Sequence, residues 1–330
     1  MVAYTGIQGQ NILIVSSDPA NPTEGQIWYN STSNLLKGYA NVVTNAWASG
    51  GNLNSGRTTL AGAGTQTAAL GFGGYSPGIT TASESYNGTA WTTTPSLNTA
   101  RRIVMGTGLQ TAALAFGGLG APGVSTNLTA TELWNGSSWT NNPTGLPVGR
   151  HGGGTAGTQT ATLVFGGSPY INTTASFDGS TWTAVPGTLN TGRQSLAGAG
   201  TQTAALAFGG NIPGNRTAAT ELWNGSSWTN NPTGLNTARS SLGGAGTQTA
   251  AIGFGGYSTG NTGATELWNG STWTTSPGNM ATARYNLASA KSGTQTAALG
   301  FGGYVGGSPY SNATEEWTGA SVQVRTITTS

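Results

Sequence analysis

The chain has 330 residues, of which 56 are glycine, one is histidine and none is cysteine. With 11 basic and 9 acidic residues the formal net charge is +2, which is too little positive charge to expect binding to a nucleic-acid backbone. The lack of cysteine excludes disulfides and zinc–thiolate sites, no apolar run is long enough for membrane insertion, and 11 Trp, 10 Tyr and 7 Phe argue against disorder.

The first 56 residues differ from the rest and contain four segments whose apolar and aromatic pattern predicts β-strands. These segments are Asn11–Ser16, Gln26–Asn30, Leu35–Ala40 and Ala46–Ser49. The stretch from Gly25 to Lys37, GQIWYNSTSNLLK, resembles a motif that is frequent in tail-fibre and other virion proteins of tailed phages. This short resemblance implies a virion or extracellular location.

From residue 57 onward the chain consists of six repeats. Each begins with an arginine, followed by a loop similar to Gly-Thr-Gln-Thr, a Phe-Gly-Gly triplet and, in five repeats, two aromatic residues five positions apart. The arginines are Arg57, Arg101, Arg150, Arg193, Arg239 and Arg284. Steps of 44, 49, 43, 46 and 45 residues between them delimit repeats at about 57–100, 101–149, 150–192, 193–238, 239–283 and 284–330.

Each repeat is predicted to form four short strands, and no helical period appears in any of them. In the repeat that begins at Arg193, the predicted strands are 194–198, 203–208, 217–223 and 226–230. Asn224-Gly225 joins the last two, and Asn-Gly between short strands indicates a tight hairpin turn. Four strands every 40 to 50 residues or so is the period of a propeller blade, so we expect an all-β fold of four-stranded antiparallel blades.

The landmarks of the repeats resemble the kelch motif, which has an arginine opening its first strand, a Gly-Gly doublet ending its second, an aromatic residue in its third and a tryptophan near its fourth. In one repeat these are Arg239, Gly255-Gly256, Trp268 and Trp273. The resemblance covers residues 57 to about 328 and implies a kelch-like β-propeller, similar to the central domain of galactose oxidase. Because kelch propellers serve as enzymes, adaptors and lectin-like binders, the resemblance leaves the function open.

The number of blades depends on the N-terminal segment. Trp47 precedes Arg57 by 10 residues, which matches the spacing between the last tryptophan of one repeat and the arginine of the next. We therefore favour seven blades, with residues 1–56 as a degenerate N-terminal blade; the alternative is six blades beside a separate β-meander. The sixth repeat has Trp317 but no second tryptophan, and its last strand is predicted at Ser321–Thr328.

Antiparallel strand order predicts which loops share a face of the propeller. The loops between strands one and two and between strands three and four lie on one side and are nearly identical in all repeats. The loops between strands two and three lie on the other side and vary, as a binding surface on a constant scaffold would. These variable loops are Tyr75–Thr80, Leu119–Asn127, Ser168–Asn172, Asn211–Arg216, Tyr257–Thr262 and Tyr304–Asn312.

Aromatic side chains beside Asn, Ser and Thr suit sugars, because the rings stack on apolar sugar faces and the polar groups bind the hydroxyls. The expected ligand-binding residues are Tyr75, Tyr170, Arg216, Tyr257, Tyr304 and Tyr310, with Arg102 as a further contact. The competing interpretation for each tyrosine is packing on the edge of its own blade. The tryptophans are expected in the core, and a central channel lined by Met105 and Lys291 is the alternative ligand site.

The repeated arginine and a repeated third-strand glutamate could be read as a catalytic ring. Chemistry needs asymmetric roles, however, so regular copies favour structural pairing or carbonyl binding between blades. The third repeat has Ala175 in place of the glutamate, so its arginine must find another partner. The glutamates are Glu84, Glu132, Glu221, Glu266 and Glu315.

Enzyme chemistry finds little support in the sequence. The copper site of galactose oxidase needs two histidines and a cysteine-linked tyrosine, whereas this chain has one histidine and no cysteine. The segment Ser176–Trp182 is similar to a sialidase aspartate box, but its glycine follows the aspartate directly, and a glycosidase needs two convergent carboxylates. We therefore expect no catalytic residue, no metal and no cofactor.

The sequence thus predicts a non-catalytic phage virion protein, of the tail-fibre or receptor-binding kind, which recognises a host cell-surface glycan through its variable loops. The alternative is a purely structural virion decoration or adaptor protein, whose variable face contacts other virion subunits and binds no glycan. Neither function involves nucleic acid or membrane insertion, and both are compatible with a homo-oligomer.

Overall fold

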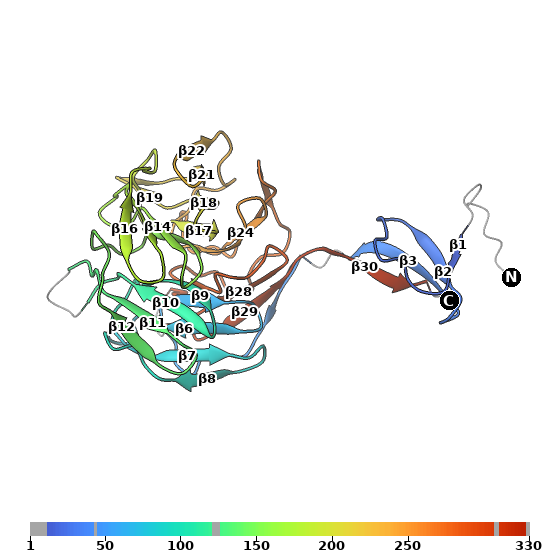
Figure 1. Ribbon diagram of the computed structural model, residues 1–330, viewed down its shortest axis with the longest axis horizontal. Coiled ribbons are helices and arrows are strands. Elements are labelled where there is room, and N and C mark those ends of the chain that lie inside the picture. Colours follow the sequence, from blue (N-terminus) through green and yellow to red (C-terminus); the bar gives the residue numbers. More distant parts are fainter. Residues whose placement is uncertain (1–11, 43–44, 121–125, 307–309, 328–330) are drawn as a thin grey trace. The chain divides into compact units, whose positions relative to one another are not determined.

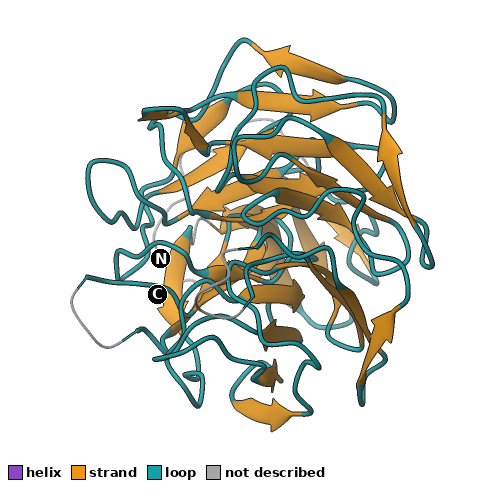
Figure 2. Ribbon diagram, turned by 90° about the vertical axis from the view of Figure 1, so that its left-hand side faces the viewer, coloured by secondary structure: helices purple, strands orange, loops and turns teal. Residues whose placement is uncertain are grey.

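The computed structural model describes residues 12–42, 45–120, 126–306 and 310–327. All regular elements in these ranges are β-strands (Figure 2). The chain divides into two compact units: Met1–Thr44 together with Gly319–Ser330 forms unit 1, and Asn45–Thr318 forms unit 2. No helix in the described ranges has the length and apolar character needed to span a membrane.

Unit 2 contains six four-stranded antiparallel sheets, which we call blades 1 to 6 (Figure 1). Blade 1 consists of β5 (Ala61–Gly64), β6 (Ala69–Phe72), β7 (Ser83–Tyr86) and β8 (Trp91–Thr94). Blade 2 consists of β9 (Met105–Leu109), β10 (Ala112–Phe116), β11 (Thr131–Trp134) and β12 (Trp139–Asn142). Blade 3 consists of β13 (Gly154–Gly157), β14 (Thr162–Phe165), β15 (Thr174–Phe177) and β16 (Trp182–Val185). Blade 4 consists of β17 (Ala197–Gly200), β18 (Ala205–Phe208), β21 (Thr220–Trp223) and β22 (Trp228–Asn231). Blade 5 consists of β23 (Gly243–Gly246), β24 (Ala251–Phe254), β25 (Thr265–Trp268) and β26 (Trp273–Thr275). Blade 6 consists of β27 (Ala288–Ser289), β28 (Ala297–Phe301), β29 (Thr314–Thr318) and β4 (Ala46–Ser49). The expected all-β, propeller-like fold is confirmed.

The first strands of the blades lie side by side in chain order, and the contacts return from blade 6 to blade 1. The Ile103 N–H donates to the Thr59 carbonyl across blades 2 and 1, and the Thr59 N–H donates to Asn286 O of blade 6 at 2.9 Å. Between adjacent blades, the phenylalanine of the Phe-Gly-Gly triplet in one blade packs against a small residue in the first strand of the following blade. A Cβ on Gly244 would lie 2.7 Å from Phe208 Cζ, so this contact requires glycine.

Blade 6 takes its outer strand from the N-terminal part of the chain, from residues that the seven-blade interpretation assigned to a blade of their own. β4 pairs with β29 and places Trp47 opposite Trp317, as Trp273 lies opposite Trp268 in blade 5. Trp47 therefore fills the position of the second tryptophan that the sixth repeat lacks. The six four-stranded sheets of unit 2 agree with the six-blade alternative, because the remaining N-terminal strands belong to unit 1.

Unit 1 has one sheet with the order β1 (Leu13–Val15), β2 (Ile27–Asn30), β3 (Leu35–Val42) and β30 (Ser321–Thr326). β1 and β2 are parallel, and the other two pairs are antiparallel. β30 was expected to complete the sixth blade, but it pairs with β3 instead. Asn11 and Thr328, the outer limits of two predicted strands, lie outside the described residues.

Asp18 binds three side chains of the segment Gly25–Lys37 in unit 1. Its carboxylate accepts hydrogen bonds from Trp28 Nε1 at 3.0 Å and Asn30 Nδ2 at 2.8 Å, and it forms an ion pair with Lys37 at 2.7 Å. These interactions, led by the hydrogen bond from Lys37, lower the pKa of Asp18 to about 2. Trp28, Asn30 and Lys37 of this segment therefore all bind the carboxylate of Asp18, which lies outside the segment.

Candidate functional site

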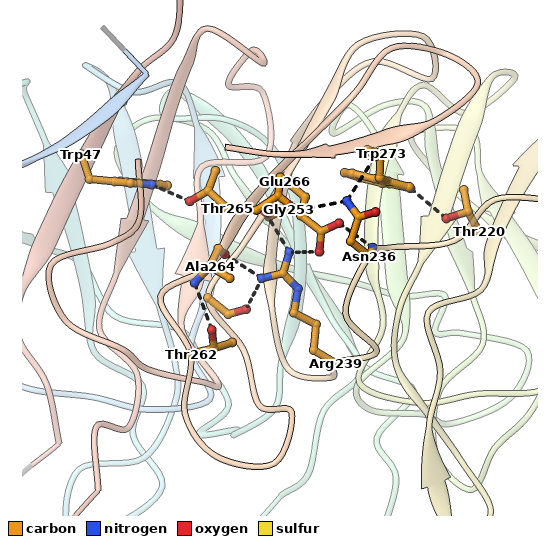
Figure 3. Close-up of polar contacts among 12 residues, drawn as sticks. Trp47, Thr220, Asn236, Arg239, Gly253, Thr262, Ala264, Thr265, Glu266 and Trp273 are labelled. Carbon is orange, nitrogen blue, oxygen red and sulfur yellow. Dashed lines mark hydrogen bonds and ion pairs between the residues drawn. The ribbon is translucent and has the colours of Figure 1, made fainter. Parts of the chain in front are cut away.

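The repeated arginines and glutamates form a buried internal support in five of the six blades of unit 2, as Figure 3 shows for blade 5. Arg239 donates to Glu266 Oε1 at 2.9 Å and to the carbonyl of Ala264 at 2.6 Å. Glu266 Oε2 accepts the N–H of Asn236, in the connection from the preceding blade, at 2.6 Å. The same pairing occurs in blades 1, 2, 4 and 6. The expected structural pairing is therefore present, but within each of these blades and not between blades.

Blade 3 departs from this pattern at two linked positions. Ala175 replaces the glutamate, and Pro147 stands three residues before Arg150, where the other repeats provide the N–H that the glutamate accepts. Arg150 instead donates to the carbonyls of Gly166 and Thr173 and to the Thr173 hydroxyl at 3.0 Å. Burial lowers the pKa of Arg150 to about 10.

The nearly identical loops between first and second strands also serve the scaffold. Gln248 Nε2 donates to the carbonyls of Ala205 at 3.0 Å and Trp223 at 2.6 Å, both in the preceding blade. The corresponding glutamines make equivalent bonds around the ring. The glutamine side chains of these loops therefore join neighbouring blades.

The opposite side of unit 2, which we call the variable face, is built from two positions of each repeat. One is the residue after the repeat arginine, and the other is the residue after Gly-Gly. The two positions are paired by β-bridges in five blades. The pairs are Thr58–Tyr75, Arg102–Leu119, Gln194–Asn211, Ser240–Tyr257 and Tyr285–Tyr304. Both positions change from repeat to repeat while their backbones stay in register.

Five tyrosines on the variable face form a continuous series of ring contacts across blades 5, 6 and 1, which we call the tyrosine arc. Its ring centroids are 5.3 Å apart for Tyr257 and Tyr285 and 5.4 Å apart for Tyr285 and Tyr304. The series continues at 6.1 Å to Tyr310 and at 5.5 Å from there to Tyr75. All five side chains are partly buried and partly exposed, so they present an aromatic surface held by its own edge contacts.

An arginine lies at each end of the tyrosine arc. The guanidinium of Arg216 lies 4.4 Å from the ring centroid of Tyr257, and that of Arg102 lies 5.7 Å from the ring centroid of Tyr75. Neither arginine forms an ion pair with a described carboxylate, and the Nε of each is buried without a hydrogen-bond partner. Arg102, Tyr75, Tyr285, Tyr304 and Tyr310 line a hollow of about 320 Å³.

The structure brings together five of the six residues expected to bind a ligand. Tyr75, Tyr257, Tyr304 and Tyr310 belong to the tyrosine arc, and Arg216 flanks it. Tyr170 makes no ring contact with the arc and lines a neighbouring hollow of about 210 Å³ together with Arg216. Parts of two variable loops, 121–125 and 307–309, lie outside the described residues.

Tyr285 is the member of the arc that the loop comparison missed. It follows Arg284 directly, at a position occupied in the other repeats by Thr, Arg, His, Gln and Ser. That variation was visible in the sequence and would have identified the position. Burial, together with Tyr304 and Tyr257, raises the pKa of Tyr285, so its hydroxyl stays protonated at neutral pH.

The mouth of the central channel lies inside this region of the variable face. Six residues, one from each blade, have positive φ there: Thr59, Ile103, Gly152, Ser195, Ser241 and Asn286. Backbone hydrogen bonds join most of them to the next, for example Ser241 N–H to Ser195 O at 2.8 Å. A positive φ is unfavourable for Ile and Thr, so the hydrogen-bonded ring holds a strained backbone around the mouth.

The described residues contain no group of three or more His, Asp or Glu side chains that could hold a metal ion. No family model matches the chain, and no curated protein matches it. The tyrosine arc with its two arginines is therefore the candidate site on its geometry alone.

Proposed function

We propose that the chain is a non-catalytic virion protein of a tailed phage that binds a host cell-surface glycan at its variable face. The tyrosine arc, with an unpaired arginine at each end, is the observation that carries this proposal. The kelch-like order of landmarks in each repeat and the phage-like motif from Gly25 to Lys37 support the wider context.

Sugar binding suits the arc because a partly exposed tyrosine offers both a ring face and a hydroxyl. The ring face stacks on the C–H groups of a pyranose, and the hydroxyl can donate to or accept from a sugar hydroxyl. Polar side chains such as those of Gln194, Asn211 and Asn261 lie on the same face. They make few or no hydrogen bonds to other described residues, so they can bind a ligand. Such a surface provides shape and hydrogen bonds without a reactive group.

The charge of the face favours an acidic glycan. Arg102 and Arg216 have no carboxylate partner among the described residues, whereas five of the six repeat arginines do. A planar guanidinium can bind a sugar carboxylate through two parallel hydrogen bonds. We therefore propose oligosaccharides that contain uronic or similar acids as the preferred class.

A structural role in the virion is the second candidate, and one observation favours it. The described part of unit 1 leaves several large apolar side chains exposed, including Ile14 at 70% and Leu13 at 49%. Exposed apolar side chains of this size are typical of surfaces that contact other proteins. In this role unit 1 would contact other virion subunits.

A glycan array that contains matched acidic and neutral oligosaccharides tests the proposal. We expect the intact protein to bind acidic members preferentially. Tyr257→Ala and Tyr304→Ala should each weaken binding about fivefold or more, because stacking is worth on the order of 1 kcal/mol beyond the buried area. Thermal unfolding of each variant checks that the fold is retained.

Leu109→Ala is the matched control, because Leu109 is 47% exposed at the end of β9 on the opposite side of the blade. It should leave binding unchanged. Binding that survives both tyrosine substitutions, or that is lost in the Leu109 variant, would contradict the assignment of the face. Silence on the array together with stoichiometric incorporation into particles would favour the structural role.

A further inference from the structure

The sixth repeat contains an insertion that the other repeats lack. The step from the repeat arginine to the loop glutamine is nine residues in five repeats and eleven from Arg284 to Gln295. The extra residues fall between the first strand of blade 6 and its following loop, in the segment that contains Lys291 and Ser292. The insertion breaks the repeat pattern at the strand nearest the channel.

The inserted segment lies at the end of the channel that faces away from the variable face, where it binds the ends of two other first strands. The Ser292 N–H donates to Gly64 O of blade 1 at 2.8 Å, and the Ser292 hydroxyl donates to Gly108 O of blade 2 at 2.9 Å. Blade 1 lies between blades 6 and 2 in the ring, so the segment extends past the first strand of blade 1. Hydrogen bonds therefore join segments of blades 6, 1 and 2 at this end of the channel.

Lys291 lines the channel without a protein partner. The other described residues that line it are Gly, Ala, Val, Leu, Ile, Met, Ser, Thr and Asn, so Lys291 is the only titratable group among the described lining residues. The ammonium group makes no ion pair or hydrogen bond with any described residue. Partial removal from water lowers the pKa of Lys291 from 10.5 to about 8, because burial disfavours the charged form.

We propose that the central channel is a binding site for a small oxyanion, of the size of acetate, phosphate or sulfate, with Lys291 as its cationic contact. The cavity, of about 110 Å³, has room for such an ion. A partly dehydrated ammonium without a carboxylate gains most from a mobile counter-ion. The site uses none of the tyrosines of the arc and does not depend on glycan binding.

The chain has only two lysines, Lys37 and Lys291, which makes a direct measurement possible on the intact protein. With ¹³Cε-labelled lysine, NMR titration in chloride buffer should show one lysine with a pKa near 8, which Lys291→Met removes. Phosphate, sulfate or acetate at about 10 mM should raise that pKa toward 10.5, because a bound anion favours the charged ammonium. The signal of Lys37, which is paired with Asp18, should not respond.

Thermal unfolding at pH 7 provides a second readout. The same ions should raise the midpoint of the wild-type protein by about 3 °C or more, since a ligand that binds only the folded state stabilises it. Lys37→Met is the matched control and should keep this rise, whereas Lys291→Met should lose it. An unresponsive Lys291 signal, or an undiminished rise in Lys291→Met, would overturn the proposal. A Lys291 signal that responds to oligouronate but to none of the three small ions would also overturn it, and would instead place a glycan acid group in the channel.

Discussion

At the scale of single residues, the substitutions within a repeat are coupled through buried hydrogen bonds. Each third-strand glutamate uses one oxygen for the arginine and the other for a backbone N–H three residues before that arginine, as Asn236 shows in blade 5. Pro147 has no N–H, so a glutamate in place of Ala175 would have a buried oxygen without a donor. The sequence predicted that Arg150 must find another partner, and Thr173 confirms this. The coupling to Pro147 was missed because it needs the register between a loop and a distant strand.

Glu266→Gln should destabilise unit 2 substantially. The substitution leaves the buried Arg239 charge without its counter-charge, and breaking one partner of a buried pair costs about 3–5 kcal/mol. For a unit of this size we expect a fall of roughly 10 °C in the unfolding midpoint, measured by calorimetry.

The matched comparison is blade 3, where Ala175→Glu should be neutral or destabilising and should improve when combined with Pro147→Asn. A midpoint for Glu266→Gln within about 2 °C of the wild type would contradict this account of the arginine pairs.

At the scale of the blade, adjacent sheets are joined by a tryptophan of one blade and a hydroxyl of the preceding one. Trp273 Nε1 donates to Thr220 Oγ1 at 2.9 Å, and Trp47 Nε1 makes the same bond to Thr265 at 2.8 Å (Figure 3). Between blades 2 and 1 the threonine is replaced by Ser83, and both the Ser83 hydroxyl and Trp139 Nε1 are buried without a partner. This is the one exception among the six interfaces of the described unit.

Ser83→Thr should therefore stabilise the protein. A β-branched side chain has fewer rotamers in a strand than serine and should hold its hydroxyl toward Trp139. Satisfying a buried donor is worth about 1–3 kcal/mol, so the midpoint should rise by at least 2 °C or so. Differential scanning calorimetry measures the change, and Thr220→Ser, at an interface that already has the bond, should move the midpoint the other way.

Strand positions were more predictable than strand partners. All four N-terminal strands occur within two residues of the predicted limits, because local pattern and turn residues determine where a strand forms. The partners of β4 and β30 come from the opposite part of the chain, and no local pattern records such a pairing. The loops of the candidate site were identified by their variation, but the arc also needs Tyr285, whose role depends on the contact between blades.

At the scale of the whole molecule, the chain passes between the two units twice. β4 leads from unit 1 into blade 6, and β30 leaves blade 6 to pair with β3 in unit 1. Residues 1–56 therefore are not one structural part: the segment up to Thr44 belongs to unit 1, while β4 and the residues after it belong to unit 2. A deletion at residue 56 would damage both units, whereas cuts at the unit boundaries would not.

The fragment 45–318 should fold with a midpoint within about 3 °C of that of unit 2 in the full chain, since it retains all six blades. The fragment 50–318 differs from the fragment 45–318 by the loss of β4. It should be insoluble or strongly destabilised. Removing β4 takes Trp47 from its contacts with Phe254, at 4.8 Å, and with Trp317, at 5.6 Å, and leaves β29 with an unpaired edge. An unpaired edge that carries exposed aromatic side chains promotes association. Size-exclusion chromatography and calorimetry of both fragments measure the outcome. A monomeric 50–318 fragment that unfolds at the midpoint of 45–318 would show that β4 is dispensable for closing the sixth blade.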